Sequence, residues 1–192
     1  MKKTMLAATA VLAAAAATPA AAQIPNITPF SVEARGGLAL PTGDFGAGIE
    51  TGFTVGANAT YHLLPLIGIY GGYTYNEFDV SNGELKVKDQ GFSAGVRIAV
   101  PTPLIPIDPY MKAGAVFNQL ERPSLTGVGD EKSDRKTGFE VGAGVGIGLG
   151  PKLSFTPQVT YTKYNSDLST LGGTTSEEVS HIRVDVGLRL RL

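Results

Sequence analysis

The sequence predicts an all-β fold, an eight-stranded antiparallel up-and-down transmembrane β-barrel. Three observations predict it: eight successive segments alternate apolar and polar residues with a period of two, each segment is about ten residues long or slightly longer, and short links alternate with longer polar ones. A tilted strand needs about 9–11 residues to cross a bilayer, whereas globular strands average about 5–6. The pattern is therefore typical of strands that cross a membrane.

The N-terminus has the pattern of a signal peptide. Lys2 and Lys3 precede an apolar run at 5–17, and three alanines end at Ala22. The run is shorter than the roughly 20 residues that a membrane-spanning helix needs. We expect 1–22 to be a signal peptide and 23–192 to form the barrel domain, with a retained N-terminal anchor as the alternative.

The first four segments each place apolar residues on one face. Segment 30–40 sets Phe, Val, Ala and Leu against Ser, Glu, Arg and Gly, and 51–62 sets Phe, Val, Ala and Tyr against Gly, Thr, Asn and His. In 67–76, Ile and Tyr alternate with a Gly-rich face that also carries a tyrosine. In 91–100, Phe, Ala, Val and Ile alternate with Gly, Ser and Arg. Each segment is predicted to be a strand with two unlike faces.

The second half repeats the rule. Segment 110–118 alternates Met, Ala and Phe with Tyr, Lys, Gly and Asn, and 138–149 alternates large apolar residues with glycine. Segment 153–162 opposes Leu, Phe, Val and Tyr to Ser, Thr and Gln, and 181–192 opposes Ile, Val and Leu to His, Arg, Asp and Gly. The glycine run from Gly142 to Gly150 does not match a nucleotide-binding fingerprint, because G-x-G-x-x-G is absent and no helix is predicted to follow it.

The lengths of the links indicate which end of the barrel faces the outside of the cell. The links near 63–66, 101–108 and 150–152 are short and contain proline or glycine. The longer and more polar loops are predicted at 41–50, 77–90, 119–136 and 165–178. Outer-membrane barrels have short periplasmic turns and longer extracellular loops, so we expect both termini in the periplasm.

Aromatic residues on the apolar faces gather near both ends of the strands, as in the aromatic girdles of a lipid-facing surface. The predicted girdle consists of Phe30, Phe53, Tyr61, Tyr73, Tyr75, Phe92, Phe117, Phe139, Phe155 and Tyr161. The opposite faces are rich in small residues, which an eight-stranded barrel needs because its interior has room only for side chains. An apolar face turned inward, as in a soluble lipocalin-like ligand-binding barrel, is the less favoured alternative.

Charged residues on the polar faces are predicted to form a salt-bridge network that fills the lumen, since unpaired buried charges are costly. They are Glu33, Arg35, Arg97, Lys112, Glu140, Arg183, Asp185 and Arg189. Glu33 and Arg189 are the first expected pair, because they lie at similar height on the strands that close the barrel. A structural plug is the favoured interpretation and an ion pathway the alternative.

The whole predicted barrel resembles the small eight-stranded outer-membrane barrels, the OmpA transmembrane domain, OmpX and the broader outer-membrane β-barrel domain family. The resemblance rests on "TGFEVGAGVGIGLG", "LPTGDFG", "PYMKAGAVF" and the terminal "DVGLRLRL". It implies a location in the cell outer membrane. It also implies an assembly signal for the outer-membrane assembly machinery at Asp185, Gly187, Leu190 and Leu192. The final leucine departs from the phenylalanine that family members usually carry.

Composition and motifs exclude several other classes. The chain has no cysteine, which excludes disulfide scaffolds, thiolate zinc sites and cysteine nucleophiles. Its net charge of −1 argues against a nucleic-acid binder. Of the two histidines, His62 is predicted at the periplasmic end and His181 has its neighbour Ser180 pointing to the opposite face, so no catalytic pair is expected. We expect no catalytic, cofactor or metal site.

The predicted function is therefore that of a non-enzymatic outer-membrane protein. We expect either a structural role in envelope integrity or a role in surface interaction through the four long loops. A narrow porin-like channel for ions or small solutes is the alternative. The expected partners are outer-membrane lipid and lipopolysaccharide, the assembly machinery, and an extracellular partner at the loops, and the chain is expected to be a monomer.

Overall fold

Eight long antiparallel strands close into a barrel, as predicted. The computed structural model describes residues 29–80, 86–102, 107–123, 130–132, 134–170 and 173–192. The elements are β1 (Phe30–Thr42), η2 (Gly43–Gly46), β2 (Gly52–Leu64), β3 (Ile67–Asp79), β4 (Lys86–Ala99), β5 (Ile107–Pro123), β6 (Asp130–Lys132), β7 (Lys136–Gly148), β8 (Leu153–Thr170) and β9 (Gly173–Arg191). The predicted signal peptide at 1–22 lies outside the described residues.

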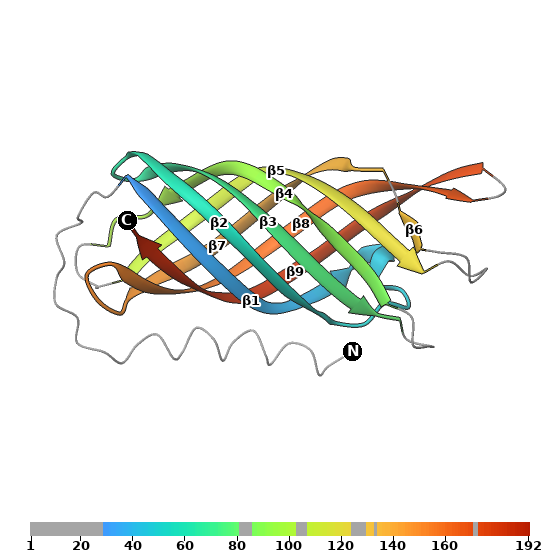
Figure 1. Cartoon of the computed structure of the whole chain (residues 1–192), viewed down its shortest axis with the longest axis horizontal. Helices are drawn as coiled ribbons and strands as arrows, with labels where there is room; N and C mark the ends of the chain where they lie inside the picture. The colour runs from blue at the N-terminus through green and yellow to red at the C-terminus, as the bar shows by residue number, and fades with distance from the viewer. Residues whose placement is uncertain (1–28, 81–85, 103–106, 124–129, 133, 171–172) are drawn as a thin grey trace.

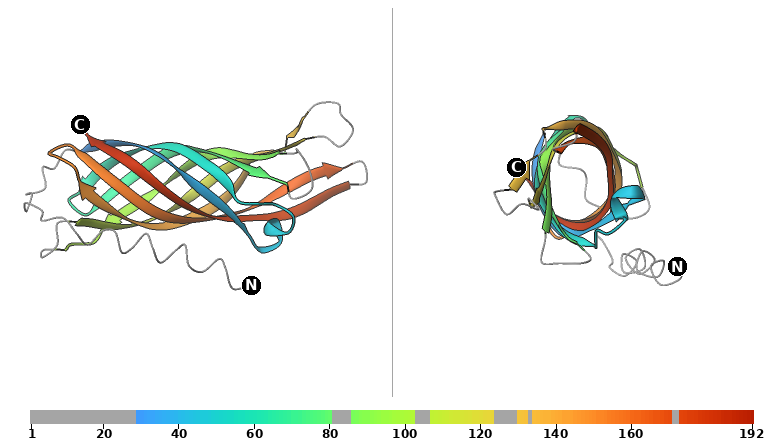
Figure 2. Two further views of the ribbon diagram at one scale, coloured as in Figure 1. Left: turned by 90° about the horizontal axis from the view of Figure 1, so that it is seen from below. Right: turned by 90° about the vertical axis from the view of Figure 1, so that its right-hand side faces the viewer.

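Each strand pairs with its neighbour along the chain, and the ends of the sheet meet. The order is β4-β3-β2-β1-β9-β8-β7-β5-β6, and β4 also pairs with β5, which closes the ring. The short β6 extends the sheet at the end of β5 and is not one of the eight barrel strands. Figure 1 shows the strongly tilted strands, and the end-on view in Figure 2 shows the closed ring.

The outward faces of the strands are apolar and the inward faces are polar. Leu38, Val55 and Met111 are among the exposed large hydrophobic residues, whereas Thr54 and Thr160 are among the buried polar ones. This is the reverse of a soluble barrel, which buries its apolar face. Within the described residues, no helix is long and apolar enough to cross a membrane.

Several strands run beyond their predicted ends, so the predicted bounds of the loops 41–50, 77–90, 119–136 and 165–178 are wrong. β1 continues to Thr42 and is followed by η2, β4 already begins at Lys86, and β8 and β9 extend to Thr170 and Gly173. The physical reason is that a strand leaving the apolar layer has water on its outer face. Both of its faces are then polar, and the period-two signal disappears although the backbone pairing continues.

The longest of these extensions is a two-stranded ribbon made by β8 and β9. β7 pairs with β8 only as far as Tyr164, and β1 pairs with β9 only as far as Ser180. Beyond those residues β8 and β9 pair with each other, up to Thr170 opposite Gly173. The ribbon projects past the other strands at the long-loop end of the barrel, on the right of Figure 1.

Inward-facing glycines make room for the largest side chains in the lumen. A Cβ atom on Gly144 would lie 2.5 Å from the hydroxyl of Tyr110, and one on Gly114 would lie 2.5 Å from the hydroxyl of Tyr70. Real Cβ atoms do not approach other atoms this closely, so a larger residue would displace the ring. A residue larger than glycine therefore does not fit at these two positions of the inner wall.

Candidate functional site

The candidate site is the lumen, which is filled by charged and polar side chains from different strands. All eight residues of the predicted network point inward. Arg35, Arg97, Lys112, Arg183 and Arg189 face Glu33, Glu140 and Asp185, and Asp89 is a further buried carboxylate. The charges of both signs are thus nearly balanced inside the barrel. Three clusters follow one another from the short-turn end to the long-loop end.

The first cluster gathers around Glu33 on β1, near the short-turn end. Arg189 donates from Nε to Glu33 Oε2 at 2.9 Å, which is the pair expected first from the sequence. An Nη1 atom of Arg97 lies 3.5 Å from the same oxygen, and Arg35 is bonded to the other carboxylate oxygen. Glu33 is therefore surrounded by three guanidinium groups from three different strands.

This cluster continues across the lumen through an aromatic ring. The guanidinium of Arg97 lies 3.4 Å from the ring centroid of Tyr110, a cation–π contact. Tyr110 donates to Gln158 at 3.0 Å, and Gln158 donates to Asp185 at 3.3 Å. Asp185 lies 3.4 Å from Arg35, which leads back to Glu33. The side chains thus form a connected circuit across the short-turn half of the barrel.

The second cluster lies around Glu140 on β7. Arg183 donates to one carboxylate oxygen at 2.7 Å, while Lys112 and Tyr70 donate to the other at 3.2 and 2.7 Å. Glu140 is 1% exposed, so these contacts replace water around its charge. The donors come from β9, β5 and β3, and the cluster therefore ties together strands on opposite sides of the barrel.

The third cluster surrounds Asp89 on β4 and has neutral donors. Tyr164 and Asn118 donate to one carboxylate oxygen, each at 2.8 Å, and Asn76 donates to the other at 3.0 Å. The Nδ1 atom of His181 lies 3.9 Å from Asp89. His181 is fully buried in the lumen.

A buried apolar cluster, which we call the apolar plug, lies next to Asp89 at the long-loop end. We use this name for the buried cluster Ala39, Phe45, Phe78, Val87, Val116, Leu120, Tyr164 and Val179, against which Ile49 and Val80 also pack. Phe45 comes from η2, which lies at the rim of the barrel, and its ring meets Phe78 edge-on at 5.5 Å. Phe78 in turn contacts the ring of His181. The plug therefore rests directly on the third cluster.

The turn that carries Phe45 is fixed to β9 by hydrogen bonds. Thr42 donates to the Ser180 hydroxyl at 3.1 Å, and the Ser180 hydroxyl donates to the Thr42 carbonyl oxygen at 2.9 Å. Gly43 has a φ of 60°, a left-handed conformation that other residues rarely adopt. The chain can therefore turn sharply after β1 and direct Phe45 into the barrel.

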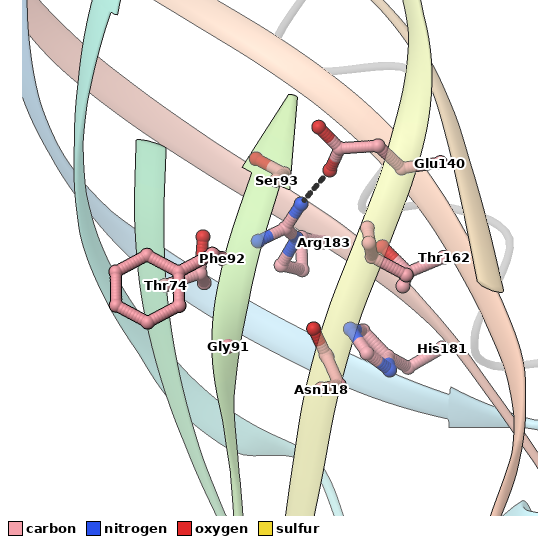
Figure 3. Close-up of a pocket in the computed structure, with 10 residues that line it drawn as sticks. Thr74, Gly91, Phe92, Ser93, Asn118, Glu140, Thr162, His181 and Arg183 are labelled. Atoms are coloured by element: carbon pink, nitrogen blue, oxygen red, sulfur yellow. Dashed lines mark hydrogen bonds and ion pairs between the residues drawn. The ribbon is translucent and has the colours of Figure 1, made fainter. Parts of the chain in front are cut away.

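A small cavity lies beside the second and third clusters (Figure 3). Its lining residues include Thr162, His181 and Arg183, together with Asn118 and Glu140. The space in which the centre of a water molecule can lie is about 10 Å³. The side chains that line this cavity thus leave little free space between the second and third clusters.

The predicted girdle residues all lie on the outward face of the barrel. Seven of them, Phe30, Phe53, Tyr61, Tyr73, Phe92, Phe117 and Phe139, belong to the exposed large hydrophobics, and Tyr75, Phe155 and Tyr161 are half-buried. At the long-loop end Tyr73 packs against Phe92, and Arg135 lies over the Phe92 ring at 5.2 Å. The aromatic residues thus border an apolar band on the outside of the barrel.

The predicted assembly signal is divided between the two faces of β9. Leu190 and Leu192 point outward and are exposed, whereas Asp185 belongs to the first cluster. A Cβ atom on Gly187 would lie 2.6 Å from the Thr156 hydroxyl and 2.9 Å from Glu33 Oε1. Gly187 therefore has a packing reason to be glycine, whether or not it is recognised during assembly.

The sequence-based prediction missed Asp89 and the apolar plug. Both involve residues of 77–90, which were predicted to be a loop. Counting back in steps of two from Gly91, which was correctly predicted to face inward, leads to Asp89 and Val87. That signal could have identified these two residues, but no apolar residues accompany them on the outer face, where Lys86 and Lys88 lie.

Comparisons with known proteins agree with this architecture. A 25 kDa outer-membrane immunogenic protein of Brucella abortus is 30% identical over 125 residues, 64% of this chain and 57% of that protein. The chain thus spans little more than half the length of that relative. Neisserial surface protein A aligns with a TM-score of 0.70 at 20% identity, over 85% of this chain and 97% of that one.

The outer membrane protein OprG from Pseudomonas aeruginosa aligns with a TM-score of 0.53 at 14% identity, over 86% of this chain and 98% of that one. At these identities the structural matches show a shared fold. The model of the outer membrane protein beta-barrel domain family matches residues 6–190. The chain therefore belongs to the outer membrane protein β-barrel domain family and is located in the cell outer membrane.

Proposed function

We propose that this protein is a closed, non-enzymatic barrel that contributes to the integrity of the cell envelope and presents its long-loop end to the outside. In this orientation the short turns and both ends of the described barrel are periplasmic, and the β8–β9 ribbon is extracellular. The barrel acts as a scaffold in the outer membrane, and the extracellular segments make the contacts.

The observation that carries this proposal is the double closure of the lumen. Guanidinium groups and the Tyr110 ring cross the proposed periplasmic half around Glu33, and the apolar plug lies in the proposed extracellular half next to Asp89. An ion would have to pass an apolar barrier and then displace bonded charges. These features favour a structural barrel over the alternative, a narrow channel for ions or small solutes.

The proposed surface role is supported by the ribbon of β8 and β9. It projects beyond the barrel, so a partner could reach it without approaching the membrane. The Brucella relative is named an immunogenic outer-membrane protein, which is consistent with exposed segments in that protein. We infer that the corresponding end of this barrel is its surface for interactions.

A non-enzymatic role is supported by the position of the histidine that lies nearest a serine. His181 is enclosed in the lumen beneath the apolar plug, and Ser180 is bonded to Thr42. A lipid substrate in the outer leaflet could not reach the imidazole. The two residues are therefore better explained by packing than by catalysis.

The remaining partners are proposals that follow from the membrane location. The apolar band with its aromatic borders is suited to outer-membrane lipid, and lipopolysaccharide is the lipid we propose at its extracellular border. The outward-facing Leu190 and Leu192 are accessible to the assembly machinery before insertion. We propose a monomer, because the sheet closes on itself within one chain.

Shortening the ribbon separates the scaffold role from the surface role. Ser166 pairs with Glu177, so residues 167–176 can be replaced by an Asn-Gly turn without changing the register of the barrel. In a strain that lacks the protein, the shortened chain should restore resistance to detergent as fully as the complete chain. It should not restore adhesion or survival in serum.

Heat-modifiable migration on a gel verifies that both chains fold. If the complete chain restores neither detergent resistance nor a surface phenotype, the proposed function is wrong. If the shortened chain restores adhesion and serum survival fully, the ribbon is not the interaction surface.

A further inference from the structure

Three buried polar side chains at one level of the lumen have hydrogen-bonding atoms without a partner in the described part of the chain. The atoms are the two ring nitrogens of His181, the hydroxyl oxygen of Thr162 and the Nε atom of Arg183. His181 is 0%, Thr162 1% and Arg183 4% exposed. Burying such groups without hydrogen bonds is costly, and native proteins nearly always provide a partner.

These three side chains line the same cavity, the one shown in Figure 3. The volume of about 10 Å³ in which a water centre can lie is close to the smallest that holds one water molecule. Polar walls also favour occupancy, because engineered apolar cavities stay dry whereas buried waters usually make about three hydrogen bonds. The size of the cavity and the polarity of its walls thus both favour a water molecule as the occupant.

We propose that this cavity is a binding site for one ordered water molecule, held by His181, Thr162 and Arg183. Water can accept the hydrogen bond of the Arg183 Nε–H and still donate to another group, so it suits a mixed set of partners. A metal cation does not suit a wall that carries a guanidinium donor. A halide ion is larger and would lie beside the Glu140 carboxylate, which also lines the cavity.

The water would join two clusters that otherwise lie side by side. Arg183 is bonded to Glu140 in the second cluster, and His181 lies 3.9 Å from Asp89 in the third. With Nδ1 nearest to Asp89, Nε2 is the ring nitrogen left to bond the water. The hydrogen-bond path then continues from the underside of the apolar plug to the Glu140 cluster. This inference does not depend on the proposed function.

A high-resolution crystal structure of the barrel tests the site directly. The expected result is a density peak at hydrogen-bonding distance, about 2.7–3.2 Å, from a ring nitrogen of His181, from Arg183 Nε and from the Thr162 hydroxyl. A second crystal grown in bromide should show no anomalous peak there. A cavity without density, or one that binds bromide, would overturn the proposal.

Two valine variants provide a matched comparison. Thr162→Val removes one of the three partners, whereas Thr156→Val changes a threonine on the same strand that is also fully buried and unpartnered but does not line the cavity. Folding of both variants is checked by heat-modifiable migration. Thr162→Val should lose the water peak or move it away from residue 162, and Thr156→Val should retain it.

Solution NMR gives a second measurement that does not need crystals. The His181 ring should show magnetisation transfer from a long-lived water, and Thr162→Val should shift its ring nitrogen resonances. Thr156→Val should leave them unchanged. Equal shifts in both variants, or no water contact in the unmodified protein, would contradict the proposal.

Discussion

Glu140 shows, at the scale of a single residue, how a charge is accommodated inside this barrel. Its carboxylate is almost completely enclosed and is bonded by Arg183, Lys112 and Tyr70. Removing one member of such a group leaves the opposite charges buried without compensation. The free-energy cost should therefore come from the partners that remain rather than from the bond that is lost.

We predict that Glu140→Ala lowers the free energy of unfolding by about 3–5 kcal/mol, because Lys112 and Arg183 then stay buried unpaired. Glu178→Ala is the matched control, since Glu178 forms an exposed pair with Lys163 at 2.8 Å and its loss should cost about 0–1 kcal/mol. Urea unfolding in lipid vesicles, followed by gel mobility, measures both. Similar losses for the two variants would show that the Glu140 cluster does not stabilise the barrel.

Glycine substitutions test the packing of the lumen in the same way. Gly144→Val should prevent folding or destabilise the barrel severely, because the new side chain would occupy the position of the Tyr110 ring. Gly71→Val is the control on an outward face, where the nearest atom to an added Cβ is 3.8 Å away. The yield of heat-modifiable folded protein reports the outcome. A folded Gly144→Val variant of normal stability would be inconsistent with the packing described.

At the scale of the elements, η2 has a role that its length does not suggest. Four residues between β1 and β2 carry Phe45 into the barrel, where it is 1% exposed and packs against Phe78. The loop thus contributes a buried side chain to the apolar plug at the long-loop end. Its position depends on Gly43 and on the hydrogen bonds between Thr42 and Ser180.

We predict that Phe45→Ala lowers stability by about 3 kcal/mol or more, as expected for removing a buried aromatic ring. Leu38→Ala, on the outward face, should cost less because the removed atoms are packed on one side only. Neither variant should conduct ions, since the clusters around Glu33 and Glu140 remain in place. Urea unfolding and vesicle leakage check the two parts of this prediction. An ion leak in Phe45→Ala would mean that the plug alone keeps the lumen closed.

The elements also show which parts of the structure could be predicted from the sequence. Inside the membrane layer, lipid requires an apolar outer face, so alternation identified every barrel strand and the inward direction of Glu33, Arg97 and Glu140. Outside that layer nothing imposes alternation, and the extensions of β3, β4, β8 and β9 were predicted as loops. The plug as a whole could not be predicted because its members, such as Phe45 and Val179, come from segments that are far apart in the sequence and meet only in the folded barrel.

At the scale of the whole molecule, closure of the sheet places the two kinds of barrier one above the other along the same axis. Strands of 13 residues rising about 3.4 Å per residue at a tilt of about 40° give a height of roughly 34 Å, somewhat more than the apolar band of about 25 Å. The polar clusters therefore lie within the height of the apolar band, and the plug lies toward the long-loop end. This arrangement is the physical basis for the proposal that the lumen is closed.

The most direct test of this account is the conductance of the purified, unmodified protein in planar bilayers, with a large porin inserted under the same conditions as a positive control. The filled lumen predicts insertion without stable current steps over the usual range of voltage. Stable unitary conductance in most insertions would contradict the closed barrel and favour the channel.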